Sequence, residues 1–135
     1  MFVDGELYAV DVAHVLKVAG YMDLTPLPAA PYAVAGIANL KGGIVTLLNL
    51  TELLGNGRRK QADYAVIFKP VVDGYGRMGL LVDNLGGLIS IEESEIIPLR
   101  PLAEDQDAGI ISGLAEPEGR LYRIIDIFSV IRKYE

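Results

Sequence analysis

The side chains that could act as a nucleophile or a general base are few in this sequence. Its 135 residues include one histidine, His14, and no cysteine. A Ser-His-Asp triad needs an exposed serine on a strained turn beside its base. None of the four serines, Ser90, Ser94, Ser112 and Ser129, stands in a Gly-x-Ser-x-Gly pattern. We therefore interpret His14 as a structural or surface histidine and predict that the protein is not an enzyme.

Acidic residues gather at two places in the C-terminal half, and such carboxylates can bind metals or transfer protons. The clusters are Glu92, Glu93 and Glu95, then Glu104, Asp105 and Asp107. A calcium loop that starts at Asp105 needs an oxygen ligand and then a glycine where Gly109 and Ile110 stand. We predict no metal site and no cofactor. An enzyme that uses a glutamate of the first cluster as its base stays a third hypothesis.

Gly74–Gly79 fits the Gly-x-Gly-x-x-Gly pattern of dinucleotide-binding turns. Such a turn opens a helix whose N-terminus holds the pyrophosphate. Here the following residues, Leu80–Val82, form an apolar run that predicts a strand. The pair Asp73-Gly74 favours a hairpin turn, so we predict a hairpin and no nucleotide site.

Composition and charge restrict the class of protein further. With 51% hydrophobic residues and a formal net charge of −6, the chain should fold around a core of its own. Residues 1–68 carry five basic and six acidic side chains, and residues 69–135 carry seven and twelve. The densest basic run is only Arg58–Lys60, so nucleic acid is not an expected partner. We recognise no signal peptide or spanning segment, which predicts a cytoplasmic protein without membrane insertion.

Most apolar residues stand in runs of strand length that are separated by turn-forming residues. The runs are Leu7–Val12, Ile44–Leu50, Tyr64–Phe68, Met78–Val82 and Leu121–Ile125. The last run follows Glu116–Gly119, where Pro117 favours a type I turn. Many short strands with such turns predict an all-β fold.

Three short segments predict helices that cap this β structure. Their expected N-caps are Asp11, Asn49 and Asp126. The first helix would carry Val12, Val15 and Leu16 on one face, and the second would end at Gly55.

An internal repeat with an offset of 77 residues is the most informative feature of the sequence. Gly36–Asn49 aligns without a gap with Gly113–Asp126, and both copies predict a strand, a tight turn, a strand and a capped helix. Weaker matches join Tyr8–Val18 with Gly79–Ile91, and Pro26-Leu27 with Pro98-Leu99. We expect a single domain, 1–135, made of related halves at roughly 1–60 and 61–135. A pseudo-twofold axis would relate the halves, and an exchange of strands between them stays open.

The order and spacing of several motifs resemble those of CheW-like chemotaxis adaptors over nearly the whole chain. The motifs are Leu27-Pro28-x-x-Pro31, Val34-x-Gly36-Ile37-x-Asn39-Leu40-Lys41-Gly42-x-Ile44-Val45, Leu48-Asn49-Leu50, Met78-Gly79-Leu80-Leu81-Val82-Asp83 and Leu121-Tyr122-Arg123-Ile124-Ile125-Asp126. The resemblance implies two five-stranded SH3-like β-barrel subdomains with short capping helices. It also implies a scaffold that couples the cytoplasmic tip of a methyl-accepting receptor to the regulatory domain of a CheA-type histidine kinase, recruited to membrane receptor arrays.

The resemblance also implies two sets of contact residues. Those for the receptor are Val15, Lys17, Val18, Asn39, Leu40, Lys41 and Gly42. Those for the kinase are Ile37, Leu47, Leu85, Gly86, Gly87 and Leu88. Plain core packing is the competing interpretation for the apolar members. The family usually has Glu, Arg and Asp where Lys17, Lys41 and Asn49 stand. The alternative function is an SH3-like or OB-like barrel that binds a small ligand, an oligonucleotide or another protein outside chemotaxis, for example in pilus motility.

Overall fold

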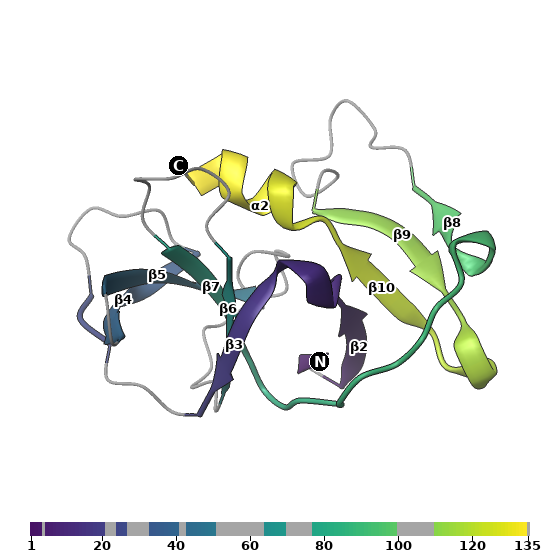
Figure 1. Ribbon diagram of the computed structural model, residues 1–135, viewed down its shortest axis with the longest axis horizontal. Coiled ribbons are helices and arrows are strands. Elements are labelled where there is room, and N and C mark those ends of the chain that lie inside the picture. Colours follow the sequence, from purple (N-terminus) through teal and green to yellow (C-terminus); the bar gives the residue numbers. More distant parts are fainter. Residues whose placement is uncertain are drawn as a thin grey trace.

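The computed structural model describes residues 1–3, 5–20, 24–26, 33–40, 43–50, 64–69, 77–99 and 110–134, with residues 132–134 as backbone only (Figure 1). The strands in these ranges are β1 (Phe2–Val3), β2 (Glu6–Ala9), β3 (Val15–Ala19), β4 (Val34–Leu40), β5 (Gly43–Asn49), β6 (Tyr64–Phe68), β7 (Arg77–Val82), β8 (Ile97–Pro98), β9 (Ile111–Ala115) and β10 (Tyr122–Ile125). The helical elements are the 3₁₀ turns η1 (Val12–His14), η2 (Glu93–Glu95) and η3 (Pro117–Gly119), and the helix α2 (Ile127–Tyr134).

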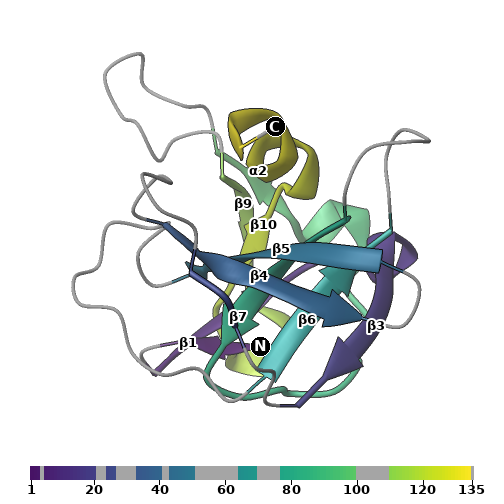
Figure 2. The ribbon, with the colours of Figure 1, turned by 90° about the vertical axis from the view of Figure 1, so that its left-hand side faces the viewer.

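The strands form two five-stranded sheets, which confirms the predicted all-β class. The terminal sheet has the order β1-β2-β10-β9-β8, and the central sheet has the order β3-β6-β7-β5-β4 (Figures 1 and 2). Each sheet contains one parallel pair, β2 with β10 or β5 with β7, among antiparallel ones. Both sheets draw strands from the first and the second half of the chain.

The strand register reproduces the 77-residue repeat pair by pair. In the hairpin β4–β5, Gly36 faces Leu47 and Ala38 faces Val45. In β9–β10 the pairs are Gly113 with Ile124 and Ala115 with Tyr122. Each hairpin also skips one residue, because Val34 faces Leu48 and Ile111 faces Ile125. The repeated sequence is therefore a repeated hairpin with a bulge at the same place.

The weaker repeat matches differ in accuracy. Thr25 bridges to Ile37, and Ile97 pairs with Leu114, so the Pro26 and Pro98 match is confirmed. The match of Tyr8 with Gly79 is wrong by one residue. The parallel pairs Tyr122 with Leu7 and Val45 with Arg77 make Leu7 the equivalent of Arg77.

One core joins both sheets and α2. Its large buried side chains include Tyr8 and Ile125 of the terminal sheet, Phe68 and Leu80 of the central sheet, and Val130 of α2. A second cluster lies within the central sheet. Figure 1 shows α2 above the line where the two sheets meet. Because burial of apolar surface drives folding, the shared cluster holds the two sheets together.

The predicted caps and turns differ from the structure in detail. Asp126 caps α2 as predicted, since its carboxylate accepts hydrogen bonds from the backbone N–H groups of Phe128 and Ser129. The prediction of a type I turn over Glu116–Gly119 is wrong. The Arg120 N–H bonds to the Pro117 carbonyl, and the residues between them, Glu118 and Gly119, have φ of 54° and 79°. Positive φ at both central residues is typical of the type I′ turn, whose twist suits a two-residue hairpin loop.

Candidate functional site

The outer strand β3 carries three of the residues predicted to contact a receptor. It is the first strand of the central sheet and pairs only with β6 in that sheet. Val15 is half-buried and packs against the shared core. Lys17 is exposed, and Val18 is 46% exposed. The edge of β3 therefore presents one cation and one apolar side chain.

A bulge in β3 adds a residue that sequence reasoning missed. Val15 faces Phe68 and Lys17 faces Ile67, so Leu16 is an extra residue in the ladder. Leu16 is 42% exposed. The spacing of Val15 and Leu16 predicted a helix, and that prediction is wrong for both. The β-branched residues Val15 and Val18 were the available signal for a strand.

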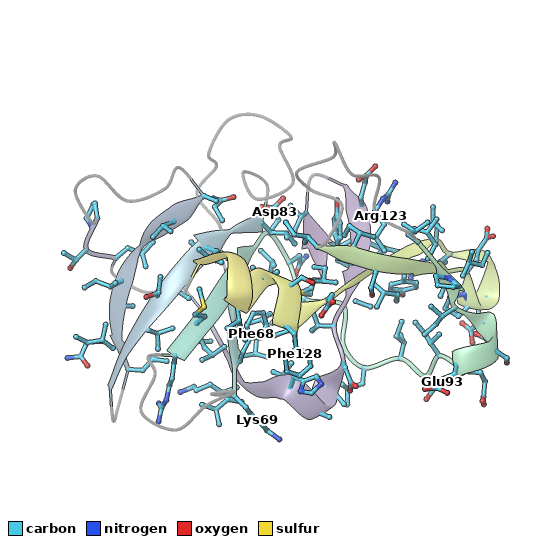
Figure 3. All side chains as sticks on the ribbon, turned by 90° about the horizontal axis from the view of Figure 1, so that it is seen from above. Phe68, Lys69, Asp83, Glu93, Arg123 and Phe128 are labelled. Atoms are coloured by element: carbon cyan, nitrogen blue, oxygen red, sulfur yellow. The ribbon has the colours of Figure 1, made fainter. Side chains whose placement is uncertain are left out.

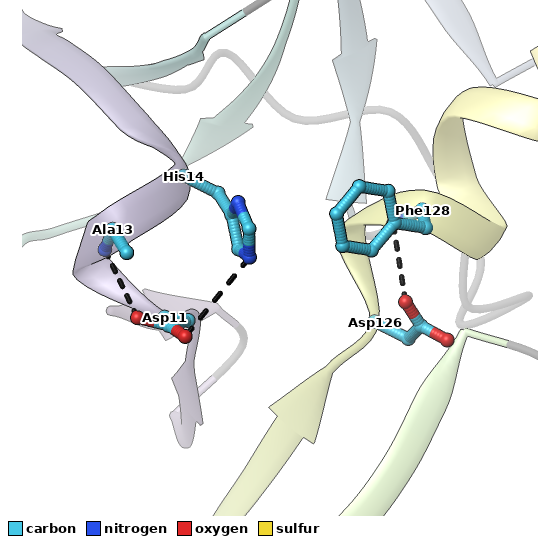
Figure 4. A network of polar contacts seen from close by, with 5 residues as sticks. All are labelled: Asp11, Ala13, His14, Asp126 and Phe128. Atoms are coloured by element: carbon cyan, nitrogen blue, oxygen red, sulfur yellow. Dashed lines mark hydrogen bonds and ion pairs between the residues drawn. The ribbon is translucent and has the colours of Figure 1, made fainter. Parts of the chain in front are cut away.

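The turn η1 fixes where β3 begins (Figure 4). Asp11 caps it as predicted, since its Oδ1 accepts a hydrogen bond from the Ala13 N–H at 2.9 Å. The His14 carbonyl accepts a bond from the Lys69 N–H after β6. The His14 ring meets the Phe128 ring edge-on, with 4.8 Å between centroids, and His14 Nε2 lies 4.0 Å from Asp11 Oδ2. His14 thus has a structural place between η1 and α2.

Two more of the predicted receptor residues, Asn39 and Leu40, lie on the opposite edge of the central sheet. Asn39 and Leu40 end β4, the last strand in the sheet order. Asn39 is exposed, whereas Leu40 is half-buried against the second core cluster. Lys41 and Gly42 lie outside the described residues, as does the predicted helix beyond Leu50.

Two residues predicted to contact the kinase lie in the same hairpin. Ile37 is half-buried, and its backbone bonds to Thr25. Leu47 has no exposed surface and belongs to the second core cluster. We therefore assign the Leu47 side chain to the core.

The remaining kinase residues follow β7, where the chain crosses to the terminal sheet. Asn84 forms a bridge with Phe2 of β1. Leu85 packs against the shared core, and Gly86 lies beside the Phe2 ring. Gly87 has a φ of 80° and is exposed. Leu88 is 84% exposed, and the neighbouring Ile89, which the sequence analysis did not select, is 44% exposed.

The candidates for catalysis do not converge in the described residues. Glu92, Glu93 and Glu95 are exposed at η2, and Figure 3 shows Glu93 at the outer end of the terminal sheet. Within the described ranges, no three His, Asp or Glu side chains form a group that could hold a metal ion. Of Gly74–Gly79, the described part from Arg77 onward is strand β7, as predicted. No described helix has the length and apolar character needed to cross a membrane.

Comparisons of sequence and of structure with known proteins assign the chain to the same family. The model of the CheW-like domain matches residues 1–135. The chain is 29% identical to the chemotaxis protein CheW of Thermotoga maritima, over 97% of this chain and 84% of that one. It is 27% identical to that of Rhizobium meliloti, over 95% and 82%. The scaffolding protein TtCheW of Thermoanaerobacter tengcongensis superposes with a TM-score of 0.79 and 28% identity, over 93% of this chain and 84% of that one. The chain therefore belongs to the CheW-like domain family and is a non-catalytic scaffold of chemotaxis-type signalling.

Proposed function

We propose that this scaffold couples the cytoplasmic tip of a methyl-accepting receptor to the regulatory domain of a CheA-type histidine kinase. The observation that carries the proposal is the match of the CheW-like domain over residues 1–135. The protein would be cytoplasmic, recruited to receptor arrays through its partners. Binding alone would be the mechanism, because a scaffold that contacts two proteins can bias the conformation of one by that of the other.

The proposed receptor contacts lie on two segments, the outer edge of β3 and the β4–β5 hairpin at the opposite edge of the central sheet. The apolar side chain of Val18 is exposed, and that of Val15 packs against the shared core. A helical receptor tip would dock here in the helix-in-groove mode, with its apolar residues as anchors. Asn39, Leu40, Lys41 and Gly42 would contribute from the hairpin.

The proposed kinase surface is the segment Leu85–Leu88 together with Ile37. Leu88 is the most exposed large apolar residue among those described. Gly86 and Gly87 of this segment are also exposed. A partner that covers the Leu88 side chain removes apolar surface from water, which favours binding.

Isothermal titration against the kinase regulatory domain from the same organism tests the proposal. We expect micromolar binding, which corresponds to about −8 kcal/mol. Leu88→Asp should weaken it at least about tenfold. Val12→Asp is the matched control, because Val12 is 59% exposed and belongs to neither predicted set.

The outcomes test the coupling function and the position of the kinase surface separately. Equal binding by both variants would remove Leu88 from the kinase surface. If the folded wild-type protein bound neither the kinase domain nor a receptor tip, the coupling function would be refuted. A barrel that serves another pathway, with a small ligand or a different protein partner, would then be the better hypothesis.

A further inference from the structure

Phe2 of β1 is an aromatic residue that belongs to neither core cluster of the described residues. Its chain neighbours Met1 and Val3 both pack in the shared core, Val3 with only 1% of its surface exposed. Because side chains alternate along a strand, the Phe2 ring lies on the other face of β1. The ring is nevertheless half-buried, so the contact that covers it lies outside the two clusters.

Gly86, in the segment that we propose as a kinase contact, lies against this ring. A Cβ atom built on Gly86 would lie 3.3 Å from Cε2 of Phe2 and 4.0 Å from its Cδ2. The φ angle of Gly86 lies outside the left-handed region, so its backbone would accept another residue. What Gly86 provides is the absence of a side chain, which lets the Phe2 ring contact the backbone of the segment.

The backbone of Phe2 also binds the residues that lead into this segment. Its N–H donates to the Asn84 carbonyl at 2.9 Å, and its carbonyl accepts from the N–H groups of Asp83 at 3.0 Å and of Asn84 at 3.2 Å. Asn84 Oδ1 in turn accepts a hydrogen bond from the Leu85 N–H at 2.8 Å. Phe2 therefore contacts the chain on both sides of Leu85, through its backbone before it and through its ring after it.

Beyond these contacts the segment is exposed to solvent. Residues 86–90 are all exposed, and Leu88 is 84% exposed. The pair Gly86-Gly87 gives the backbone a wide choice of conformations, so the direction of Leu88 depends on the residues just before the pair. A segment that adopts its binding conformation only part of the time loses affinity in proportion to that fraction. The contacts of Phe2 thus affect how Leu88 is presented to a partner.

We propose that Phe2 is a positioning residue for kinase binding, which fixes Asp83–Gly86 so that Leu88 is presented to the regulatory domain. This inference rests on the proposed function, and it adds a residue that is distant in the sequence from the segment it positions. Phe2 acts through Leu88 and does not contact the kinase itself.

Two other roles for the Phe2 ring make different predictions. A ring that contacts the kinase directly would contribute to binding independently of Leu88. A ring that only stabilises the fold would affect the binding of the kinase domain and of a receptor tip alike. The experiment must therefore include Leu88 variants and both partners.

The probe is the kinase regulatory domain from the same organism, titrated with the full chain. Phe2→Gln removes the ring but keeps a side chain of similar length. It should weaken binding about tenfold if the segment then adopts its binding conformation about a tenth of the time. Phe2→Tyr retains the ring and should bind like the wild type. Phe128→Ala is the matched control, because Phe128 is a 42% exposed aromatic residue in neither predicted contact set; we expect unchanged binding.

Double variants show whether Phe2 acts through the segment. In a chain that carries Leu88→Ala, which itself weakens binding, Phe2→Gln should have less than about a twofold further effect. Gly86→Ala should also weaken binding, because the new methyl group displaces the ring. Its effect should be lost in a chain that carries Phe2→Gln, where the flexible side chain can move aside.

Amide hydrogen exchange of the free protein measures the same contact without the kinase. The amides of Asp83, Asn84 and Leu85 are hydrogen-bonded in the structure. Phe2→Gln should speed their exchange about tenfold. The amides of the β4–β5 hairpin are the internal reference and should keep their wild-type rates.

The outcomes distinguish this proposal from the proposed function. If the wild-type chain does not bind the kinase domain, the proposed function fails and a positioning role in it fails too. If the wild-type chain binds and Phe2→Gln binds equally well, or exchanges Asp83–Leu85 at wild-type rates, the positioning role is refuted while the function stands. An undiminished effect of Phe2→Gln beside Leu88→Ala would mean direct contact with the kinase. An equal loss of affinity for a receptor tip would mean a role in stability alone, and either result overturns the proposal.

Discussion

Two glycines, Gly36 and Gly113, are equivalent in the repeat and make the same close contact. A Cβ atom built on Gly36 would lie 2.8 Å from the Thr25 carbonyl oxygen. One built on Gly113 would lie 2.9 Å from the Ile97 carbonyl oxygen. We predict that Gly36→Ala and Gly113→Ala both destabilise the protein, by forcing the same backbone crossing apart in each sheet.

The expected magnitude follows from what the new methyl group meets. The obstacle is backbone, which cannot rotate away as a side chain does, and overpacking of this kind costs about 1–3 kcal/mol. Alanine regains about 0.4–1 kcal/mol by restricting the unfolded chain. The net loss for Gly113→Ala is about 1–2 kcal/mol. Gly36→Ala should lose more, because Gly36 has a φ of 155° that alanine rarely adopts.

Urea unfolding measures this loss, with Gly43→Ala as the control. Gly43 also lies in a strand of the repeated hairpin, but nothing lies within 4 Å of a Cβ built there. We expect Gly43→Ala to match or exceed wild-type stability. For the other two, the midpoint should fall with an unchanged m-value, and the melting temperature should drop by about 3–6 °C. If Gly36→Ala or Gly113→Ala unfolds at the wild-type midpoint, the equivalence of the two crossings is wrong.

Three further changes test the core, the helix cap and the hairpin turn by the same unfolding assay. Leu80→Ala, at a fully buried position of the shared core, should cost about 2–5 kcal/mol; a smaller cost would mean that the core closes around the space. Asp126→Ala should cost about 1–2 kcal/mol, and Asp126→Asn should recover most of it, because either side chain can cap α2. Glu118→Gly should stabilise by about 0.5–1 kcal/mol, since Glu118 has a φ of 54°; no gain would mean that the turn relaxes elsewhere.

The repeated hairpin was predictable because its signals are local. Apolar runs of strand length on both sides of Lys41-Gly42-Gly43 and of Glu118-Gly119 define two hairpins. Because the two copies align without a gap, both hairpins are expected to have the same strand register. A slip of one residue in either hairpin would move its buried side chains to the other face of the sheet. The turn type was not predictable in the same way, because Pro117 and Gly119 fit more than one four-residue frame.

The pairing of strands that are distant in the sequence could not be predicted from the sequence pattern. The apolar run Leu7–Val12 predicts a strand but does not say which strand pairs with it. In the structure that strand, β2, lies parallel to β10, more than a hundred residues later. Such pairing depends on the burial of the shared core from both ends of the chain, which no local segment encodes.

The sequence predicted the exposure of the candidate contact residues only in part, for similar reasons. Exposure of Val18 and Leu88 agrees with a role in contact, whereas Leu47, with the same apolar character, lies fully in the core. Apolar residue type alone cannot separate these cases. Leu16 was missed because its spacing from Val12 fits a helix, and only the ladder with β6 reveals the bulge.

The repeat also relates the two proposed surfaces to each other. β2 and β7 are the strands that pair in parallel with the repeated hairpins. After each of them the chain crosses to the other sheet, where Val15 pairs with β6 and Asn84 bridges to β1. The proposed receptor and kinase segments, Val15–Val18 and Leu85–Leu88, begin at these two equivalent crossings. The first residue of each segment, Val15 or Leu85, packs against the core that the two sheets share. A partner that displaces either residue would therefore act on both sheets.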